Sequence, residues 1–139
     1  AEAGELLTEA LVREVREETG LEVLDPGKLI YVVQIDNPNP QQLDERLGPG
    51  SGFQATAFVF EIADWDGEIH PADPDGIVLE AYFLPMSDAI SKLEELPIRV
   101  MREPIVSFLR GEVVPGAVWL YRRRPDGMDE LIARSGSSP

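Results

Sequence analysis

The sequence predicts a single α/β domain, and three features of the chain support this fold class. A charged amphipathic helix near the start is followed by segments rich in β-branched and aromatic residues, which favour strands. Two further amphipathic stretches come after those strands. The chain has 139 residues, of which 43% are hydrophobic and 27% charged, and these values are ordinary for one globular domain.

The first element is a helix that ends at Gly20 and carries a dense group of acids. Glu14, Glu17 and Glu18 are spaced i, i+3 and i+4, so turns of about 100° per residue place them on one face. Carboxylates repel each other at this spacing, and near a helix C-terminus they also oppose the helix dipole. A hard cation such as Mg²⁺, which prefers oxygen ligands, removes both penalties. We expect an apolar ridge beside the acids to be buried, formed by Leu11, Val12 and Val15.

Arg13 precedes Glu17 by one helical turn, and we expect it to hold that carboxylate by a fork-like contact. The competing interpretation is a plain solvated helix face, which is the usual state of helices rich in Glu and Arg. The complete string of residues, rather than the acids alone, favours the functional interpretation.

The segments after this helix predict two strands, at 29–35 and 53–63, because both are rich in β-branched and aromatic residues. Residues 37–52 between them are rich in Pro and Gly, and a loop of this length is typical of a binding segment or of a disordered one. We expect a flap near the active site there, with a surface insertion of no particular role as the alternative. An acidic turn region at 64–76 and a short strand at 80–85 are predicted next. Two helices follow, one at 88–95 capped by Ser87 and one at 100–110 with Pro104 near its start and Gly111 at its end. The final predicted strand is at 117–122. We expect the domain to cover residues 1–124 and a polar, disordered tail to cover 125–139.

The composition narrows the classes of function. With 12 basic and 26 acidic residues the net charge is −14, which argues against a long nucleic acid as partner. A small anionic substrate is compatible with this charge because bound cations reverse the local field. The absence of Cys excludes disulfides, thiolate metal sites and cysteine nucleophiles. No apolar run reaches about 18 residues and no signal peptide is evident, so we expect a cytoplasmic location and no membrane partner.

Glu5 and the run Arg13-Glu14-Val15-Arg16-Glu17-Glu18-Thr19-Gly20-Leu21 resemble the Nudix box, G-x5-E-x7-R-E-U-x-E-E-x-G-U, where U is aliphatic. Every fixed position from Glu5 onward matches this pattern. The first glycine of the pattern would fall before Ala1, so we expect the chain to begin inside the motif and to lack the family's N-terminal strands. The chain therefore resembles the MutT-like Nudix hydrolases, with a box truncated at its first glycine.

The resemblance implies a Nudix-type α/β/α sandwich with a mixed β-sheet. It also implies metal-dependent hydrolysis of the pyrophosphate bond in a small nucleoside diphosphate-linked substrate. Glu14, Glu17 and Glu18 would bind Mg²⁺ or Mn²⁺, Arg13 would orient them, and a homodimer is compatible with the family. The alternative is a non-catalytic Nudix-fold module that binds a nucleotide and regulates another process, and the complete set of box acids counts against it.

The residue that takes the proton from water stays open at this stage, because a general base is defined by its reach to that proton. Glu17 is one candidate, and Glu80 is the second acid that we favour outside the box. Glu68, Asp73 and Asp75 compete with Glu80 for this role.

Other conspicuous residues fit structural roles better than chemical ones. Glu5, ahead of Glu2, is expected to support the metal from outside its ligands. We expect His70 to lie on a surface loop and both tryptophans, Trp65 and Trp119, to be partly buried. The three arginines at 122–124 are expected to be solvated or paired with nearby acids.

Overall fold

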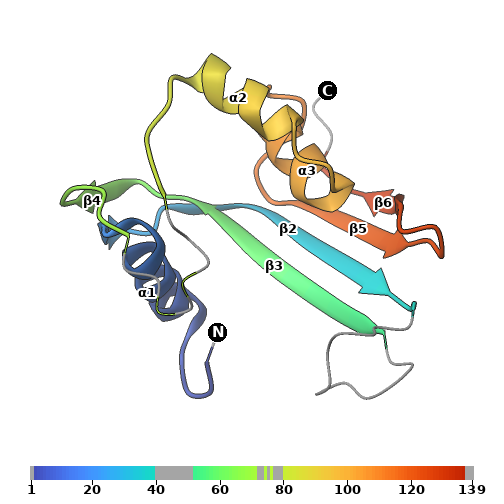
Figure 1. The fold of residues 1–139 in the computed structure, drawn as a ribbon, viewed down its shortest axis with the longest axis horizontal. Coiled ribbons are helices and arrows are strands. Elements are labelled where there is room, and N and C mark those ends of the chain that lie inside the picture. Colours follow the sequence, from blue (N-terminus) through green and yellow to red (C-terminus); the bar gives the residue numbers. More distant parts are fainter. Residues whose placement is uncertain (1, 40–51, 72–73, 75, 77–79, 137–139) are drawn as a thin grey trace. The chain divides into compact units, whose positions relative to one another are not determined.

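The computed structural model describes residues 2–39, 52–71, 74, 76 and 80–136. The chain divides into two compact units: unit 1 consists of Ala1–Lys28 and Phe60–Leu84, and unit 2 of Leu29–Val59 and Pro85–Pro139. The elements in chain order (Figure 1) are α1 (Leu7–Thr19), β1 (Glu22–Asp25), β2 (Lys28–Asn37), β3 (Phe53–Glu61), β4 (Asp64–Asp66), α2 (Met86–Glu94), α3 (Arg99–Leu109), β5 (Ala117–Arg123) and β6 (Asp129–Arg134). In the described part of the chain, no helix has both the length and the apolar character needed to cross a bilayer.

Unit 1 joins the acid-bearing helix α1 to a small two-stranded sheet. Strands β1 and β4 pair antiparallel, with Val23 opposite Trp65. Ala10 is the buried residue of the helix, while the apolar ridge predicted from the sequence is only half-buried. The side chains of Leu21 and Val23 complete the buried part of this unit.

The end of helix α1 is fixed by a glycine, as the sequence predicts. Gly20 has φ +82°, in the left-handed region, and its N–H donates to the carbonyl of Arg16 over 2.8 Å. The backbone N–H of His70 donates to the carbonyl of Thr19 over 2.6 Å, so the backbone segment around His70 lies against the turn. A Cβ at position 20 would lie 2.5 Å from the carbonyl oxygen of His70. Both the backbone angle and the close approach therefore require glycine.

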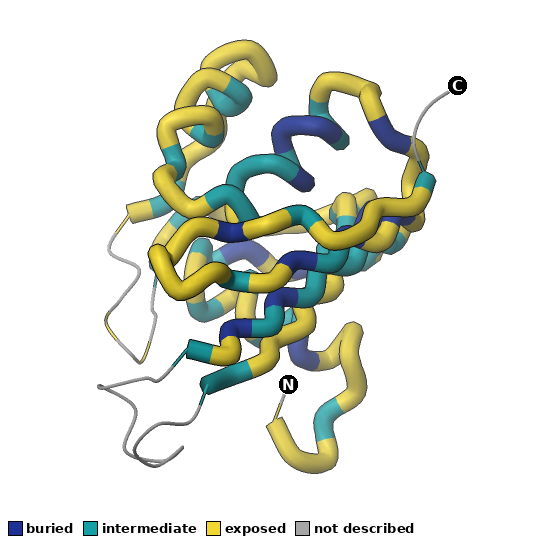
Figure 2. Tube along the Cα trace, turned by 90° about the vertical axis from the view of Figure 1, so that its right-hand side faces the viewer, coloured by how far each residue is buried: buried dark blue, intermediate teal, exposed yellow. Residues whose placement is uncertain are grey.

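Unit 2 is built on a mixed four-stranded sheet with the order β3-β2-β5-β6. Strand β2 runs parallel to β5 with Val33 opposite Trp119, and β5 runs antiparallel to β6 with Tyr121 opposite Leu131. The expected α/β class with a mixed sheet is thus confirmed. Most buried residues of the sheet lie on its two central strands, β2 and β5, and Figure 2 shows buried stretches of the chain in dark blue. The core cluster consists of Ile30, Tyr31, Ile35, Val113, Ala117, Trp119 and Tyr121.

Helix α3 packs on this core through Val100, Ile105 and Phe108. Its N-terminal turn has no capping side chain of its own, but the buried Asp129 of β6 accepts a hydrogen bond from the N–H of Val100 over 3.1 Å. A carboxylate at a helix N-terminus is favourable because it satisfies free N–H groups and complements the dipole. The same carboxylate pairs with Arg123 at 2.8 Å.

Three expectations from the sequence are wrong. A disordered tail was predicted for 125–139, but residues 129–134 form strand β6. This strand is stabilised by backbone hydrogen bonds to β5, a distant partner that the local sequence does not reveal. Residues 80–85 form no strand, because within the described residues no neighbouring strand pairs with them. Helix α2 begins at Met86 after Pro85, whose fixed φ suits a helix start, and not at a Ser87 cap.

Two details of the other predicted elements also differ. Pro104 lies in the middle of α3 and not near its start, and it is fully buried. Strand β4 falls within the segment expected to consist of turns. The predicted flap at 37–52 lies largely outside the described residues, which resume at Gly52.

The glycine requirement at the helix end can be measured against a matched position. Gly4 has nearly the same φ, +81°, but no atom lies within 4 Å of a Cβ placed there. Gly4→Ala should lower the free energy of unfolding by about 1–2 kcal/mol, the cost of the left-handed angle alone. Gly20→Ala should cost clearly more, because the backbone at His70 has to move as well. Urea unfolding of both variants tests this. Equal losses in the free energy of unfolding would show that the contact with the backbone at His70 adds nothing to the cost of a side chain at position 20.

Candidate active site

The acids of helix α1 are organised by one guanidinium. Arg13 donates from Nε and Nη2 to the two carboxylate oxygens of Glu5, at 2.8 and 3.1 Å. Its Nη1 donates to Oε2 of Glu17 at 3.1 Å, and its Nη2 lies 3.6 Å from Oε1 of Glu14. The predicted contact between Arg13 and Glu17 is therefore present, but the fork itself engages Glu5.

The pairing with Arg13 changes the acidity of Glu5. The hydrogen bond from Arg13 lowers the pKa of Glu5 from 4.5 to about 2, and the backbone N–H of Glu2, which donates to Glu5 over 2.9 Å, acts in the same direction. The pKa of Arg13 is raised by the same contact. Glu5 is thus ionised at neutral pH and holds the guanidinium of Arg13 in place. The sequence identified Glu5 as a fixed position of the box, but it did not show these contacts.

Arg16 forms a second fork on the same helix, toward the following strand. Its Nε and Nη2 each donate to a carboxylate oxygen of Glu22 at 2.8 Å. This contact raises the pKa of Arg16 and lowers that of Glu22. It ties the last turn of α1 to β1.

The three predicted metal ligands differ in their surroundings. The side chain of Glu17 is 31% exposed and that of Glu14 is 55% exposed, and Glu18 is also exposed. Their chemistry fits Mg²⁺ or Mn²⁺, because carboxylate oxygens are the ligands that such ions prefer. In the part of the chain that the structure describes, no three acidic or histidine side chains already converge as a metal site. Since like charges at this spacing repel, an ion would have to draw the carboxylates together.

The structure places the candidate acids outside the box in different situations. Glu80 is exposed on a segment without regular structure, and among the described residues no hydrogen bond or ion pair involves it. Glu68 is exposed on the turn after β4, while Asp73 and Asp75 lie outside the described residues. Among the described residues, neither Glu80 nor Glu68 has a hydrogen bond or ion pair with Arg13 or Glu17, so the general base stays a prediction.

The remaining conspicuous side chains have structural surroundings. Trp119 is fully buried and stacks on Tyr121 with ring centroids 6.3 Å apart. Trp65 is half-exposed and stacks on Phe83 at 6.0 Å. His70 is exposed. The expected pairing of the three arginines is confirmed, by contacts from Arg122 to Asp36, from Arg123 to Asp129 and from Arg124 to Asp126.

Comparisons with known proteins agree with this site and fold. A family model described as the NUDIX domain matches residues 1–104. Among solved structures, the mutator MutT protein from Bacillus halodurans is similar, with a TM-score of 0.63 and 21% identity over 97% of this chain and 76% of that chain. At this identity the likeness concerns the fold. No curated protein sequence matches the chain.

A mixed sheet with three helices, one of them carrying the ordered box acids, defines a Nudix-type α/β fold. Because the family model covers most of the sequence, the chain belongs to the Nudix family and is a Nudix hydrolase.

The Glu5–Arg13 pair gives a prediction about acidity. Glu5 should stay ionised down to a pH of about 2. Because its pKa is lower in the folded than in the unfolded state, the pair stabilises the folded chain above pH 4.5 and this contribution is lost as the pH falls toward 2. In Arg13→Gln the pKa of Glu5 should return toward its ordinary value.

Carboxyl ¹³C NMR titration measures this directly, and Glu22 provides the internal control. The pKa of Glu22 is lowered by Arg16 and should not change in Arg13→Gln. An Arg16→Gln variant should show the reverse, with Glu22 restored and Glu5 unaffected. A Glu5 carboxyl that keeps its low pKa without Arg13 would contradict the assignment.

Proposed function

We propose that this Nudix hydrolase is metal-dependent and cleaves the pyrophosphate bond of a small nucleoside diphosphate-linked substrate. The observation that carries the proposal is the arrangement of the box residues on α1 and directly before it, in which Arg13 binds both Glu5 and Glu17. The chain's net charge of −14 makes a long nucleic acid an unfavourable partner, whereas a small phosphate ester can be bound together with cations.

Glu14, Glu17 and Glu18 are the residues that would hold Mg²⁺ or Mn²⁺. When bound, such an ion neutralises phosphate charge, orients the diphosphate and lowers the pKa of a bound water. Arg13 keeps the carboxylate of Glu17 from rotating freely, because a hydrogen bond at 3.1 Å and a rigid planar donor restrict it. Glu5 fixes Arg13 in turn, so that the metal ligand is held by a chain of two charge-assisted contacts.

For the proton of the attacking water we propose Glu17 or Glu80. Glu17 is on helix α1, and Glu80 is exposed, with no side-chain partner in the part of the chain that the structure describes. A general base contributes about 10²- to 10⁴-fold to a rate, so replacement of each acid separates the two candidates. A Glu80→Gln variant that loses turnover but keeps its metal affinity assigns the base to Glu80, whereas turnover kept in Glu80→Gln assigns it to Glu17.

The proposal predicts the behaviour of amide variants. Glu17→Gln and Glu18→Gln should each lower turnover of a nucleoside diphosphate panel by about two orders of magnitude or more, while circular dichroism shows an unchanged fold. Glu130→Gln, an exposed acid on β6, is the matched control and should stay within about twofold of the wild type. Ligand binding without turnover in the wild type would favour the regulatory module over the enzyme.

Metal binding itself can be tested without any substrate. At a free Mg²⁺ concentration about 100-fold above its Kd, linkage predicts about 2.7 kcal/mol of added stability, visible as a higher Tm. The double variant Glu14→Gln/Glu18→Gln should lose this increase. Potassium chloride at matched ionic strength controls for screening. A wild-type Tm that does not respond to Mg²⁺ or Mn²⁺ would refute the metal site and would leave family membership untouched.

A further inference from the structure

Strand β3 lies at one edge of the four-stranded sheet of unit 2 (Figure 1). Its nine residues follow β2 on one side, and in the part of the chain that the structure describes no strand pairs with its other side. The backbone N–H and C=O groups along such an edge are available to a further strand. Residues 54–58 are all exposed, so this edge can be reached over five successive positions.

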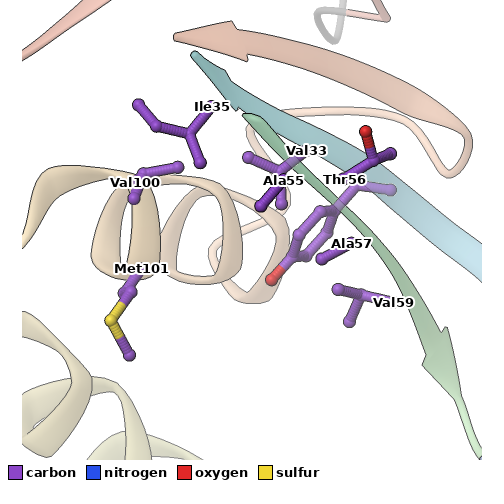
Figure 3. A pocket seen from close by; sticks show the side chains of 9 residues that line it. Val33, Ile35, Ala55, Thr56, Ala57, Val59, Val100 and Met101 are labelled. Atoms are coloured by element: carbon purple, nitrogen blue, oxygen red, sulfur yellow. The ribbon is translucent and has the colours of Figure 1, made fainter. Parts of the chain in front are cut away.

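The sequence of β3 lacks the features that normally protect an edge strand from pairing. Residues 53–60 contain no charged residue and no proline, the residue types that block edge pairing in other proteins. The side of the strand that faces helix α3 carries Ala55, Ala57 and Val59 (Figure 3). Side chains alternate along a strand, so Phe58, which is 46% exposed, lies on the other face. An uncharged, largely apolar strand of this length favours association through its edge.

Strand β6, at the opposite edge of the same sheet, provides an internal comparison. Its six residues include Asp129, Glu130 and Arg134, and a register shift interrupts its pairing with β5. Charges and irregular pairing keep an edge strand from recruiting another strand. The two edges of the sheet therefore differ, and β3 is the one suited to pairing.

The distribution of charge favours a second copy of this chain as the partner. Unit 2 contains eleven acidic and nine basic residues, whereas unit 1 contains fifteen acidic and three basic ones. Two copies can therefore meet through unit 2 with little net repulsion, although the whole chain has a charge of −14. A basic partner would be attracted to unit 1 instead, and it would meet no charged residue between 53 and 60 on β3.

We propose that β3 pairs antiparallel with β3 of a second copy, so that the two sheets continue into each other across a two-fold axis. In such a contact the same strand supplies both halves of the interface, and assembly stops at the dimer. Thr56 is the middle residue of the exposed stretch 54–58 and lies close to the axis in this arrangement. The pairing uses backbone groups at the free edge and covers the exposed ring of Phe58. It does not involve the box acids, so it can fail or hold independently of the proposed hydrolysis.

Sedimentation equilibrium of the full chain tests the oligomeric state. One copy has a mass of 15.4 kDa, and we expect the wild type to sediment at twice this mass at micromolar concentrations. Phe58→Lys removes apolar area and brings a lysine from each copy into the interface, so the dissociation constant should rise by about tenfold or more. Ile132→Lys is the matched control, because Ile132 is 49% exposed on the other edge strand, β6, and it should leave the dimer unchanged.

A nitroxide on a single cysteine tests the location of the interface. The wild-type chain contains no Cys, so one introduced thiol is labelled at one position. Labelled Thr56→Cys should show dipolar broadening of its EPR spectrum, and the broadening should disappear when excess unlabelled wild-type chain is added. Glu130→Cys, labelled on β6, should show no broadening. This measurement decides the question even where Phe58→Lys fails to fold.

The proposal is overturned by a wild type that stays monomeric up to millimolar concentration, or by a dimer that folded Phe58→Lys leaves intact. Equal weakening by Ile132→Lys would overturn it as well. Assemblies that grow beyond two copies would indicate open-ended contacts between different surfaces and contradict the two-fold arrangement. Broadening at Glu130→Cys without broadening at Thr56→Cys would place the interface at another strand.

Discussion

The candidate active site depends on the shared use of one arginine by three acids. Arg13 makes two hydrogen bonds to Glu5 and one to Glu17, and its Nη2 also lies near Glu14. Without this cation, helix α1 would carry uncompensated like charges close to its C-terminal end, where the dipole also opposes them. A lysine would not replace it, because only a guanidinium presents donors in a fixed fork to two partners at once. The rigidity of the site therefore originates in a planar cation and not in apolar burial, since the helix buries little beyond Ala10.

Unit 2 is stabilised in a different way, by a buried carboxylate on strand β6. Asp129 has a side chain only 1% exposed, pairs with Arg123 and caps helix α3 through the N–H of Val100. Glu103 on the same helix accepts a hydrogen bond from the hydroxyl of Tyr121 over 2.8 Å. These contacts join α3 to two strands of the sheet, so the helix is positioned by directed polar bonds as well as by its apolar face.

Local features of this fold could be predicted from the sequence, whereas features created by distant partners could not. The end of α1 at Gly20 follows from backbone conformation alone, and the contact of Arg13 with Glu17 follows from helical spacing. The fork on Glu5 joins residues eight positions apart, and only the fixed spacing of the box pointed to it. Strand β6 was missed because it is short and lies within a segment that is polar as a whole, and because its pairing partner is the distant strand β5. Residues 80–85 have strand-like composition but lack the partner that makes a strand.

The proposed metal site would meet the diphosphate of a substrate, and every nucleoside diphosphate derivative presents that same group. Contacts to a group that all these compounds share cannot distinguish among them, because specificity is a difference in binding between competing compounds. The box therefore cannot select among such compounds, and selectivity has to come from residues outside it.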